Sequence, residues 1–461
     1  MTTRAGVLGL APRRIWTPRA AGGVREVALL AGPAVLQTLS DTVLSIVDMA
    51  IVARLGSAEL GGVGFGGLWL WTTLSLFVGT ASGLQTFVAR ALGDGEGASK
   101  GRWLWQAAWA LVPAVSIWML VVAWRVEAVF SWLAPGSDLL GPASEYTLAR
   151  LAGGPAIVGC VLMASFFRGL GDTRTPLVAA LAANSVNVVL SWALVLGEFG
   201  FPAWGPAGAG VSTSVANWIA LGVLSAVLFR GRRRREHGTF PPCRPDLWTL
   251  FRFLRTSLPV GAQWFLDLSS FAIFSTVIAR MGTESAAANQ AMIQILSLSF
   301  MQASGIAIAA GSLVGRYVGA RNFEAAVRTH HSAQLLALLL AGGLAMLFLA
   351  APQALLGVFS PAEAVLELGR PLILLGALFQ LVDARVIIVA GVLRGAGDTR
   401  WPFLAQTASA WLFRIPLLYF LAVFLEGGVL GAWKAELLHI VFVTILLHRR
   451  FRSGAWQDLA L

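Results

Sequence analysis

The sequence predicts an all-α polytopic membrane protein whose roughly twelve spanning helices form two similar six-helix lobes. Three observations lead to this fold class. The chain of 461 residues is 57% hydrophobic and only 12% charged. Apolar runs of about 20 residues, the length of a membrane-spanning helix, recur from end to end. A polar ten-residue phrase occurs twice, each time directly after such a run.

The composition excludes a water-soluble globular protein, because soluble domains carry about 25% charged residues. The mean hydropathy of +0.74 agrees with this. The first 25 residues contain arginines but no apolar core followed by a small-residue cleavage site, so we predict no cleaved signal peptide.

The apolar runs place the expected spans, each long enough to cross a bilayer as a helix. They cover residues 27–53, 62–89, 103–124, 146–167, 175–197, 208–229, 256–279, 287–315, 332–350, 371–393, 402–424 and 429–447.

The basic residues predict the orientation. A net charge of +11 also suits nucleic-acid binding. With a cytoplasmic N-terminus, however, only four of the 34 Lys and Arg residues fall in outside loops, namely Arg54, Arg125, Arg280 and Arg370. Because this is the positive-inside asymmetry, we expect a plasma (inner) membrane protein with both termini cytoplasmic. We expect the run RGRRRR at 230–235 to touch anionic lipid rather than nucleic acid.

Little in the sequence points to enzyme chemistry. Cys160 and Cys243 lie far apart in the predicted topology, so no disulfide is expected, and the five histidines are too scattered for a metal cluster. No Walker-type glycine loop is followed by Lys. We therefore predict a monomer that is not an enzyme, needs no cofactor and draws energy from an ion gradient.

The two phrases, FRGLGDTRTP at 167–176 and LRGAGDTRWP at 393–402, lie 226 positions apart. One ungapped offset over so much of each half indicates an internal duplication. It also pairs earlier residues: Pro33 with Pro259, Gln37 with Gln263, Asp41 with Asp267, Gly79 with Gly305, and Arg90 with Arg316.

Six helices per copy make the copies parallel repeats, related by a pseudo-two-fold axis along the membrane normal. We interpret RGxGDTR as a cytoplasmic turn, in which Gly permits the bend, Asp and Thr bind local backbone, and Pro starts the next helix. Twin lobes are typical of secondary transporters. The expected parts are a cytoplasmic N-terminal tail (1–26), an N-lobe (27–230), a basic linker (231–252), a C-lobe (253–448) and a cytoplasmic C-terminal tail (449–461).

Acidic residues inside spans are functional candidates, because an Asp at the centre of a spanning helix costs about 2.5–3.5 kcal/mol. Asp41 and Asp48 lie seven residues apart on the first helix and face nearly the same way. Such carboxylates can hold a proton or coordinate a cation. The alternative is a purely structural hydrogen bond to a neighbouring Ser or Thr.

Asp267 and Asp383 lie in the seventh and tenth spans, each among apolar residues. Two carboxylates on facing helices suit a hard cation such as Na⁺, which prefers oxygen ligands. The alternative is a structural ion pair. Arg414 is the expected charge partner, since Arg385 lies two residues from Asp383 and points elsewhere on the same helix.

The last span carries Lys434, Glu436 and His439. We expect Lys434 and Glu436 to snorkel toward the outer interface. A helix-packing hydrogen bond is the preferred interpretation of His439, with a proton relay as the alternative.

Taken together, FFRGLGDTRTP followed by NSVNVVLSW, the VDMA of the first helix, and QLVDARVIIVAGVLRGAGDTR resemble the multidrug and toxic compound extrusion (MATE) family, closest to its norfloxacin-efflux-like branch. The resemblance covers about residues 25–450. It implies two six-helix lobes in a V shape and exchange of H⁺ or Na⁺ for organic, often cationic, compounds.

In the N-lobe, the resemblance makes Asp48 the family's first-helix acid and Asn187 the asparagine near it. Some branches have a second Asp four residues later, where this chain has Ser191. This departure weakens the case for an N-lobe sodium site of that kind.

In the C-lobe, the resemblance assigns Asp267 to the seventh-helix acid, usually Glu, and Asp383 to the tenth-helix acid. It implies an H⁺ or Na⁺ site there. Asp41 and Arg385 match no family site residue, and Asp41 remains a candidate from its position alone.

These observations predict an ion-coupled antiporter that exports small amphiphilic, mainly cationic compounds by alternating access. Aromatic residues lining the substrate cleft would stack on flat cations, and Trp264 and Phe379 are guesses for that role. Packing against lipid is the preferred interpretation of any single aromatic residue. The alternative function is a flippase for lipid-linked precursors, which would need a strongly cationic cavity. Acids in the spans outnumber bases, which favours export of cations.

Overall fold

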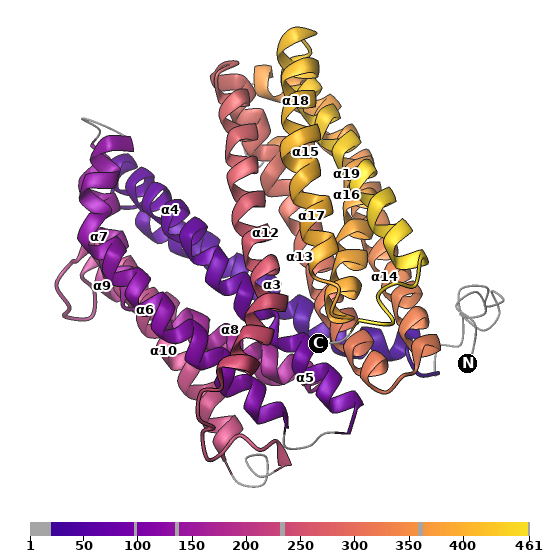
Figure 1. Cartoon of the computed structure of the whole chain (residues 1–461). Helices are drawn as coiled ribbons and strands as arrows, with labels where there is room; N and C mark the ends of the chain where they lie inside the picture. The colour runs from indigo at the N-terminus through magenta and orange to yellow at the C-terminus, as the bar shows by residue number, and fades with distance from the viewer. Residues whose placement is uncertain (1–19, 96–98, 134–137, 231–235, 358–362, 460–461) are drawn as a thin grey trace. The chain divides into compact units, whose positions relative to one another are not determined.

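A computed structural model describes residues 20–95, 99–133, 138–230, 236–357 and 363–459. In that part of the chain the regular elements are helices and no β-strand occurs (Figure 1). Eleven of the described helices are long and apolar enough to cross a membrane, and one bent pair makes up to twelve spans. The predicted all-α membrane fold is confirmed. The N-terminal tail before residue 20 and most of the RGRRRR run lie outside the described residues.

The chain folds into two compact units. Unit 1 comprises Met1–Val35 and Gln263–Leu461, and unit 2 comprises Leu36–Ala262. Two long helices therefore divide between the units: α3 (Val24–Val52) begins in unit 1, and α12 (Leu247–Ala279) begins in unit 2.

Unit 2 holds the rest of α3, the start of α12 and the helices between them, indigo to pink in Figure 1. These are α4 (Ser57–Ser82), α5 (Leu84–Gly93), α6 (Ser99–Leu133), α7 (Leu140–Leu151), α8 (Gly154–Gly169), α9 (Arg174–Leu196) and α10 (Gly205–Phe229). The bent span is α7 with α8, which meet at 53°.

Unit 1 holds the rest of α12 and the later helices, pink to yellow in Figure 1. These are α13 (Thr283–Gly319), α14 (Phe323–Ala350), α15 (Pro352–Gly357), α16 (Glu363–Gly395), α17 (Arg400–Ser409), η1 (Ala410–Arg414), α18 (Ile415–Leu418), η2 (Tyr419–Phe424) and α19 (Gly428–Arg452).

The eleventh span is widened into two π-helical segments, η1 and η2, on either side of Pro416. Proline has no backbone N–H and its ring crowds the carbonyl four residues earlier, so Pro416 disturbs the α-helical hydrogen bonding around it. Single-turn π segments often occur at functional sites. Here η1 ends at Arg414, whose buried side chain belongs to the charged cluster described below.

The repeated phrase forms a turn in both copies, and the predicted bonding of the aspartate to local backbone occurs in the first. Gly171 and Gly397 adopt φ angles of 82° and 91°, which glycine tolerates without strain. Asp172 Oδ1 accepts hydrogen bonds from the backbone N–H groups of Arg174 (3.1 Å) and Thr175 (3.0 Å), which opens α9. Pro176 lies in the first turn of that helix.

In each repeat, one glycine lies in close contact with the first part of the other repeat's leading helix, α12 or α3. A Cβ added to Gly79 would lie 2.7 Å from Gly261 Cα, and one added to Gly305 would lie 2.7 Å from Val35 Cα. The two contacts are equivalent under the 226-residue offset. The N-lobe and C-lobe expected from the sequence kept every helix whole, whereas the compact units divide inside α3 and α12. The two glycines permit close packing of the first part of each of these helices.

We therefore expect Gly305→Val to destabilise unit 1 by about 1–3 kcal/mol, because the backbone of α3 must move away. The measurement is the apparent melting temperature of detergent-purified protein. Gly342→Val is the matched control, since a Cβ there meets nothing within 4 Å. Equal melting temperatures for the two variants would refute the close-packing argument.

Candidate ion-coupling sites

In unit 2, Asp48 on α3 faces α9. Its Oδ2 accepts a hydrogen bond from Asn187 Nδ2 at 2.9 Å, and its Oδ1 accepts one from Ser191 Oγ at 3.0 Å. Ser191 in turn lies 2.7 Å from the hydroxyl of Ser212 on α10. Both carboxylate oxygens of Asp48 thus have neutral donors from a fully buried polar row.

Asp41 forms a separate site on the same face of α3. Asn184 Nδ2 donates to Asp41 Oδ1 at 3.2 Å. Seven helical residues span about 10 Å along the axis, and α9 presents a different asparagine to each acid. Asp41 and Asp48 therefore do not form one carboxylate pair. Arginines act electrostatically on each of them, Arg168 on Asp41 and Arg150 on Asp48.

Removing the amide of Asn187 is expected to weaken this arrangement. Asn187→Ala deprives Asp48 of one of two donors, and a hydrogen bond to a charged group contributes about 1.5–3 kcal/mol. A lower melting temperature of purified protein would show the effect. Asn217→Ala is the control, because Asn217 Nδ2 bonds only the carbonyl of Thr213 in its own helix. If both variants melt alike, Asn187 does not hold Asp48.

In unit 1, a buried charged cluster joins the π-helical segment to α19. Arg414 Nη1 donates to both carboxylate oxygens of Glu436, at 3.3 and 3.4 Å, and Arg414 Nη2 donates to Ser270 on α12. His439 lies one turn after Glu436, with Nδ1 3.8 Å from Glu436 Oε1 and Nε2 3.1 Å from Ser409 Oγ. Arg414 and Glu436 are each only 6% exposed.

Asp267 lies at the edge of this cluster. Gln263, one turn earlier on α12, donates to its Oδ2 at 3.4 Å. The permanent charges acting on Asp267 are, in decreasing order, those of Arg414 and Arg394, and His439 adds to them only when it is protonated.

Asp383 is the least compensated acid. In the described part of the chain no hydrogen bond or ion pair joins it to another residue, and the charged group that acts on it is the like-charged Glu436. Within unit 1, the charge of Glu436 thus repels that of Asp383. The charge of Arg414 attracts both Glu436 and Asp267.

The charges of the two units differ. With the histidine neutral, the described cluster of unit 1 sets three carboxylates against two guanidiniums: Asp267, Asp383 and Glu436 against Arg394 and Arg414. Unit 2 sets two against two: Asp41 and Asp48 against Arg150 and Arg168. Since an uncompensated charge in a low-dielectric interior is costly, the cluster of unit 1 is the less well compensated of the two.

The last span departs from expectation. Lys434 is exposed, but Glu436 does not snorkel: it is buried and paired with Arg414. That prediction for Glu436 was wrong. Residues three positions apart share one face of a helix, and on α19 the face of positions 436 and 439 is buried. The preferred interpretation of His439, a helix-packing hydrogen bond, agrees with its contact to Ser409. Arg385 is exposed, and the groups on which its charge acts are His330 and His448.

The two aromatic residues suggested for the substrate cleft, Phe379 and Trp264, differ in their surroundings. Phe379 belongs to the core of unit 1, 9% exposed, with its ring 5.8 Å from Trp433 in an edge-to-face contact. This contact agrees with the preferred interpretation of packing, and the role of Phe379 in a cleft stays a prediction. Trp264 is partly buried, and its role stays a prediction.

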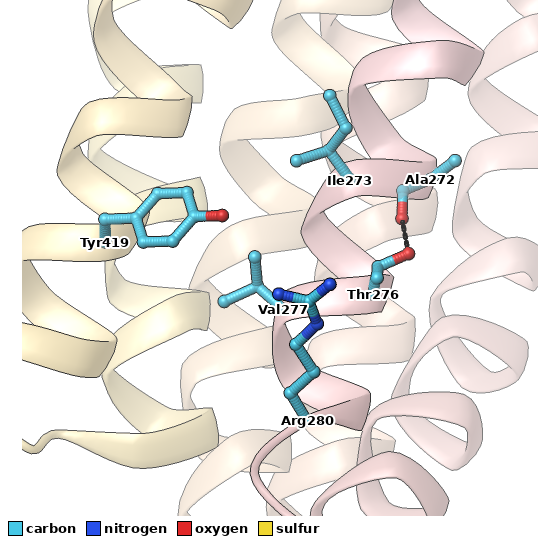
Figure 2. A pocket seen from close by; sticks show the side chains of 6 residues that line it. All are labelled: Ala272, Ile273, Thr276, Val277, Arg280 and Tyr419. Atoms are coloured by element: carbon cyan, nitrogen blue, oxygen red, sulfur yellow. Dashed lines mark hydrogen bonds between the residues drawn. The ribbon is translucent and has the colours of Figure 1, made fainter.

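Unit 1 has a pocket between α12 and η2, near Arg280 at the end of α12. Figure 2 shows Tyr419 pointing across it toward Ile273 and Val277, and Thr276 bonded to the carbonyl of Ala272 at 2.8 Å. Neither Asp267 nor Asp383 lines this pocket.

Sequence reasoning passed over several polar partners, chiefly Ser212, Glu436, Arg168 and Arg394. The i, i+3 spacing of Glu436 and His439 was a usable signal of a shared helix face. Nothing in the sequence showed that Ser212, 21 positions after Ser191, would meet its hydroxyl.

The fold and the buried charges define a polytopic membrane protein of two repeated halves with acids held inside the spans. The sequence profile of the MatE family matches residues 33–193 and 259–420, one match in each repeat. The chain therefore belongs to the MatE family.

Two curated relatives align over nearly the whole chain, and both are named "Probable multidrug resistance protein NorM". The protein from Thermotoga maritima is 27% identical over 450 residues, covering 95% of this chain and 94% of its own. The protein from Xanthomonas axonopodis pv. citri is 30% identical over 438 residues, covering 95% of both.

Solved structures support the fold. A structure titled "Outward-facing conformation of a multidrug resistance MATE family transporter of the MOP superfamily" superposes with a TM-score of 0.88 at 17% identity, covering 100% of both chains. The "Crystal structure of eukaryotic MATE transporter AtDTX14" gives 0.84 at 19% identity, covering 94% of this chain and 96% of the other.

Proposed function

We propose that this MATE multidrug efflux transporter is a secondary antiporter that exports small amphiphilic, mainly cationic compounds in exchange for H⁺ or Na⁺. Membership of the family and the relatives named as multidrug resistance proteins support export. The observation that carries ion coupling is the excess carboxylate of unit 1, centred on Asp383, which has no bonded partner in the described chain.

Binding of one cation at this cluster would neutralise its excess charge. A ligand shifts a conformational equilibrium only by its different affinity for the two states. A cluster that keeps the ion in one state and releases it in the other supplies that difference, which is what alternating access requires. Oxygen atoms of Asp267 and Asp383 suit Na⁺, and either carboxylate can accept a proton.

The relatives from bacteria and the positive-inside distribution of Lys and Arg support insertion in the inner membrane with both termini in the cytoplasm. We expect the monomer to be the working unit. A flippase for lipid-linked precursors is less well supported, because each in-span guanidinium of the two clusters acts on a carboxylate of its own unit rather than facing an anionic headgroup.

The test is uptake of a fluorescent organic cation into vesicles reconstituted with purified protein, with proton and sodium gradients imposed separately. Transport driven by at least one gradient is expected, and vesicles without protein are the control. If neither gradient drives transport, ion coupling is refuted. If labelled polyprenyl pyrophosphate crosses instead, the chain is a flippase.

A further inference from the structure

The repeated phrase RGxGDTR contains two arginines, which differ in burial. The first, Arg168 or Arg394, is partly buried, whereas the last, Arg174 or Arg400, is exposed. In the first phrase the turn is built by Gly171 and Asp172. In the second, Gly397 takes the same left-handed conformation while Asp398 pairs with Arg450. Turn geometry therefore leaves the first arginine of each phrase unexplained.

In unit 2 this arginine reaches the acid-bearing face of α3. Arg168 Nη2 donates to Gln37 Oε1 at 2.9 Å. Gln37 and Asp41 are four residues apart and so share one face of the helix. Arg168 is the charged group that acts on Asp41, whose remaining side-chain partner is the neutral Asn184.

Unit 1 has the same three residue types at the same offset, and there the glutamine bonds the acid, whereas in unit 2 it bonds the arginine. Gln263 bonds Asp267 at 3.4 Å, and Arg394 and Asp267 act on each other electrostatically. The added feature of unit 1 is that Arg414 and His439 also act electrostatically on Asp267. A glutamine, an acid and an arginine thus recur as a set in both copies.

A guanidinium does not lose its proton in a protein, so a nearby carboxylate compensates the charge of a partly buried arginine. Resting on the proposed function, we propose that the arginine beginning each RGxGDTR phrase is the fixed counter-charge of the same repeat's leading-helix acid, Arg168 for Asp41 and Arg394 for Asp267. As positioning residues, the two arginines set how strongly these acids attract the coupling cation.

A double-mutant cycle tests the pairing without any transport. Arg394→Gln and Asp267→Asn each leave one charge unpaired and lower the melting temperature of the purified protein. The double variant, which removes both charges, should melt higher than the worse single variant. The cycle of Arg168→Gln with Asp41→Asn should show the same sign with a smaller size, because Asp41 is exposed. Additive losses in both cycles overturn the proposal.

Cation dependence tests the second half of the proposal, which a merely structural role would not affect. In reconstituted vesicles, Arg394→Gln should lower the half-saturating concentration of the coupling cation about tenfold, because an adjacent opposite charge shifts ionisation by one to three powers of ten. Arg394→Lys, which keeps the charge, should stay close to the parent protein. Arg400→Gln, which removes the exposed arginine of the same phrase, is the matched control.

An unchanged half-saturation in Arg394→Gln, or an equal change in Arg400→Gln, overturns the proposal even when the cycle shows coupling. If the parent protein transports with neither gradient, it is the proposed function that fails, and the cycle alone then decides the pairing.

Discussion

Asp383→Asn is expected to reduce ion-driven export at least tenfold while the protein still folds. Asp383 is the carboxylate of unit 1 with no bonded partner in the described chain and with the like-charged Glu436 nearby. Neutralising it balances the cluster without any bound cation. The variant therefore mimics the cation-bound state permanently, and the gradient can no longer change the protein's charge.

The measurement is uptake of the fluorescent cation under the gradient that drives the parent protein, with melting temperature as the check on folding. Because the substitution removes an uncompensated charge, that temperature should not fall. Glu284→Gln, at the exposed start of α13, is the control for loss of an acid from the same unit. Normal export by Asp383→Asn would move the coupling site elsewhere.

Arg414→Met should be the most damaging substitution for stability, at about 3–5 kcal/mol. The side chain is 6% exposed and donates hydrogen bonds to Glu436 and Ser270. Its charge also acts on Asp267. Losing it strands carboxylates in a low-dielectric interior. Combining it with Glu436→Gln should restore part of the loss, because one stranded charge is then gone.

Thermal unfolding in detergent, followed by intrinsic fluorescence, measures both variants. Arg385→Met is the control, since Arg385 is exposed on α16 and should change stability little. The argument for a buried ion pair fails if Arg414→Met melts like Arg385→Met, or if adding Glu436→Gln makes the protein less stable still.

Much of the fold could be predicted because each membrane span is recognised from the hydropathy of one continuous stretch of sequence. A run such as 175–197 is apolar throughout, and the structure places α9 at Arg174–Leu196. The 226-residue offset likewise reappears as two matches to one family. The resemblance placed Asn187 near Asp48, and the 2.9 Å contact between them agrees.

The partners of the site could be predicted less well, because they come from separate helices. Glu436 meets Arg414 across 22 positions, and Arg168 meets Gln37 across 131. Neither spacing follows a helical period, so no local pattern reveals it.

The sequence by itself determined that this chain spans a membrane in two parallel copies with acids inside the spans, since hydropathy and repetition need no tertiary contact. Only the tertiary structure decided which acids are compensated, that Glu436 is buried, and that the leading helices divide between the units. The physical reason is that charge balance and close approach depend on which side chains meet across helices, and in the membrane each unpaired charge weighs heavily.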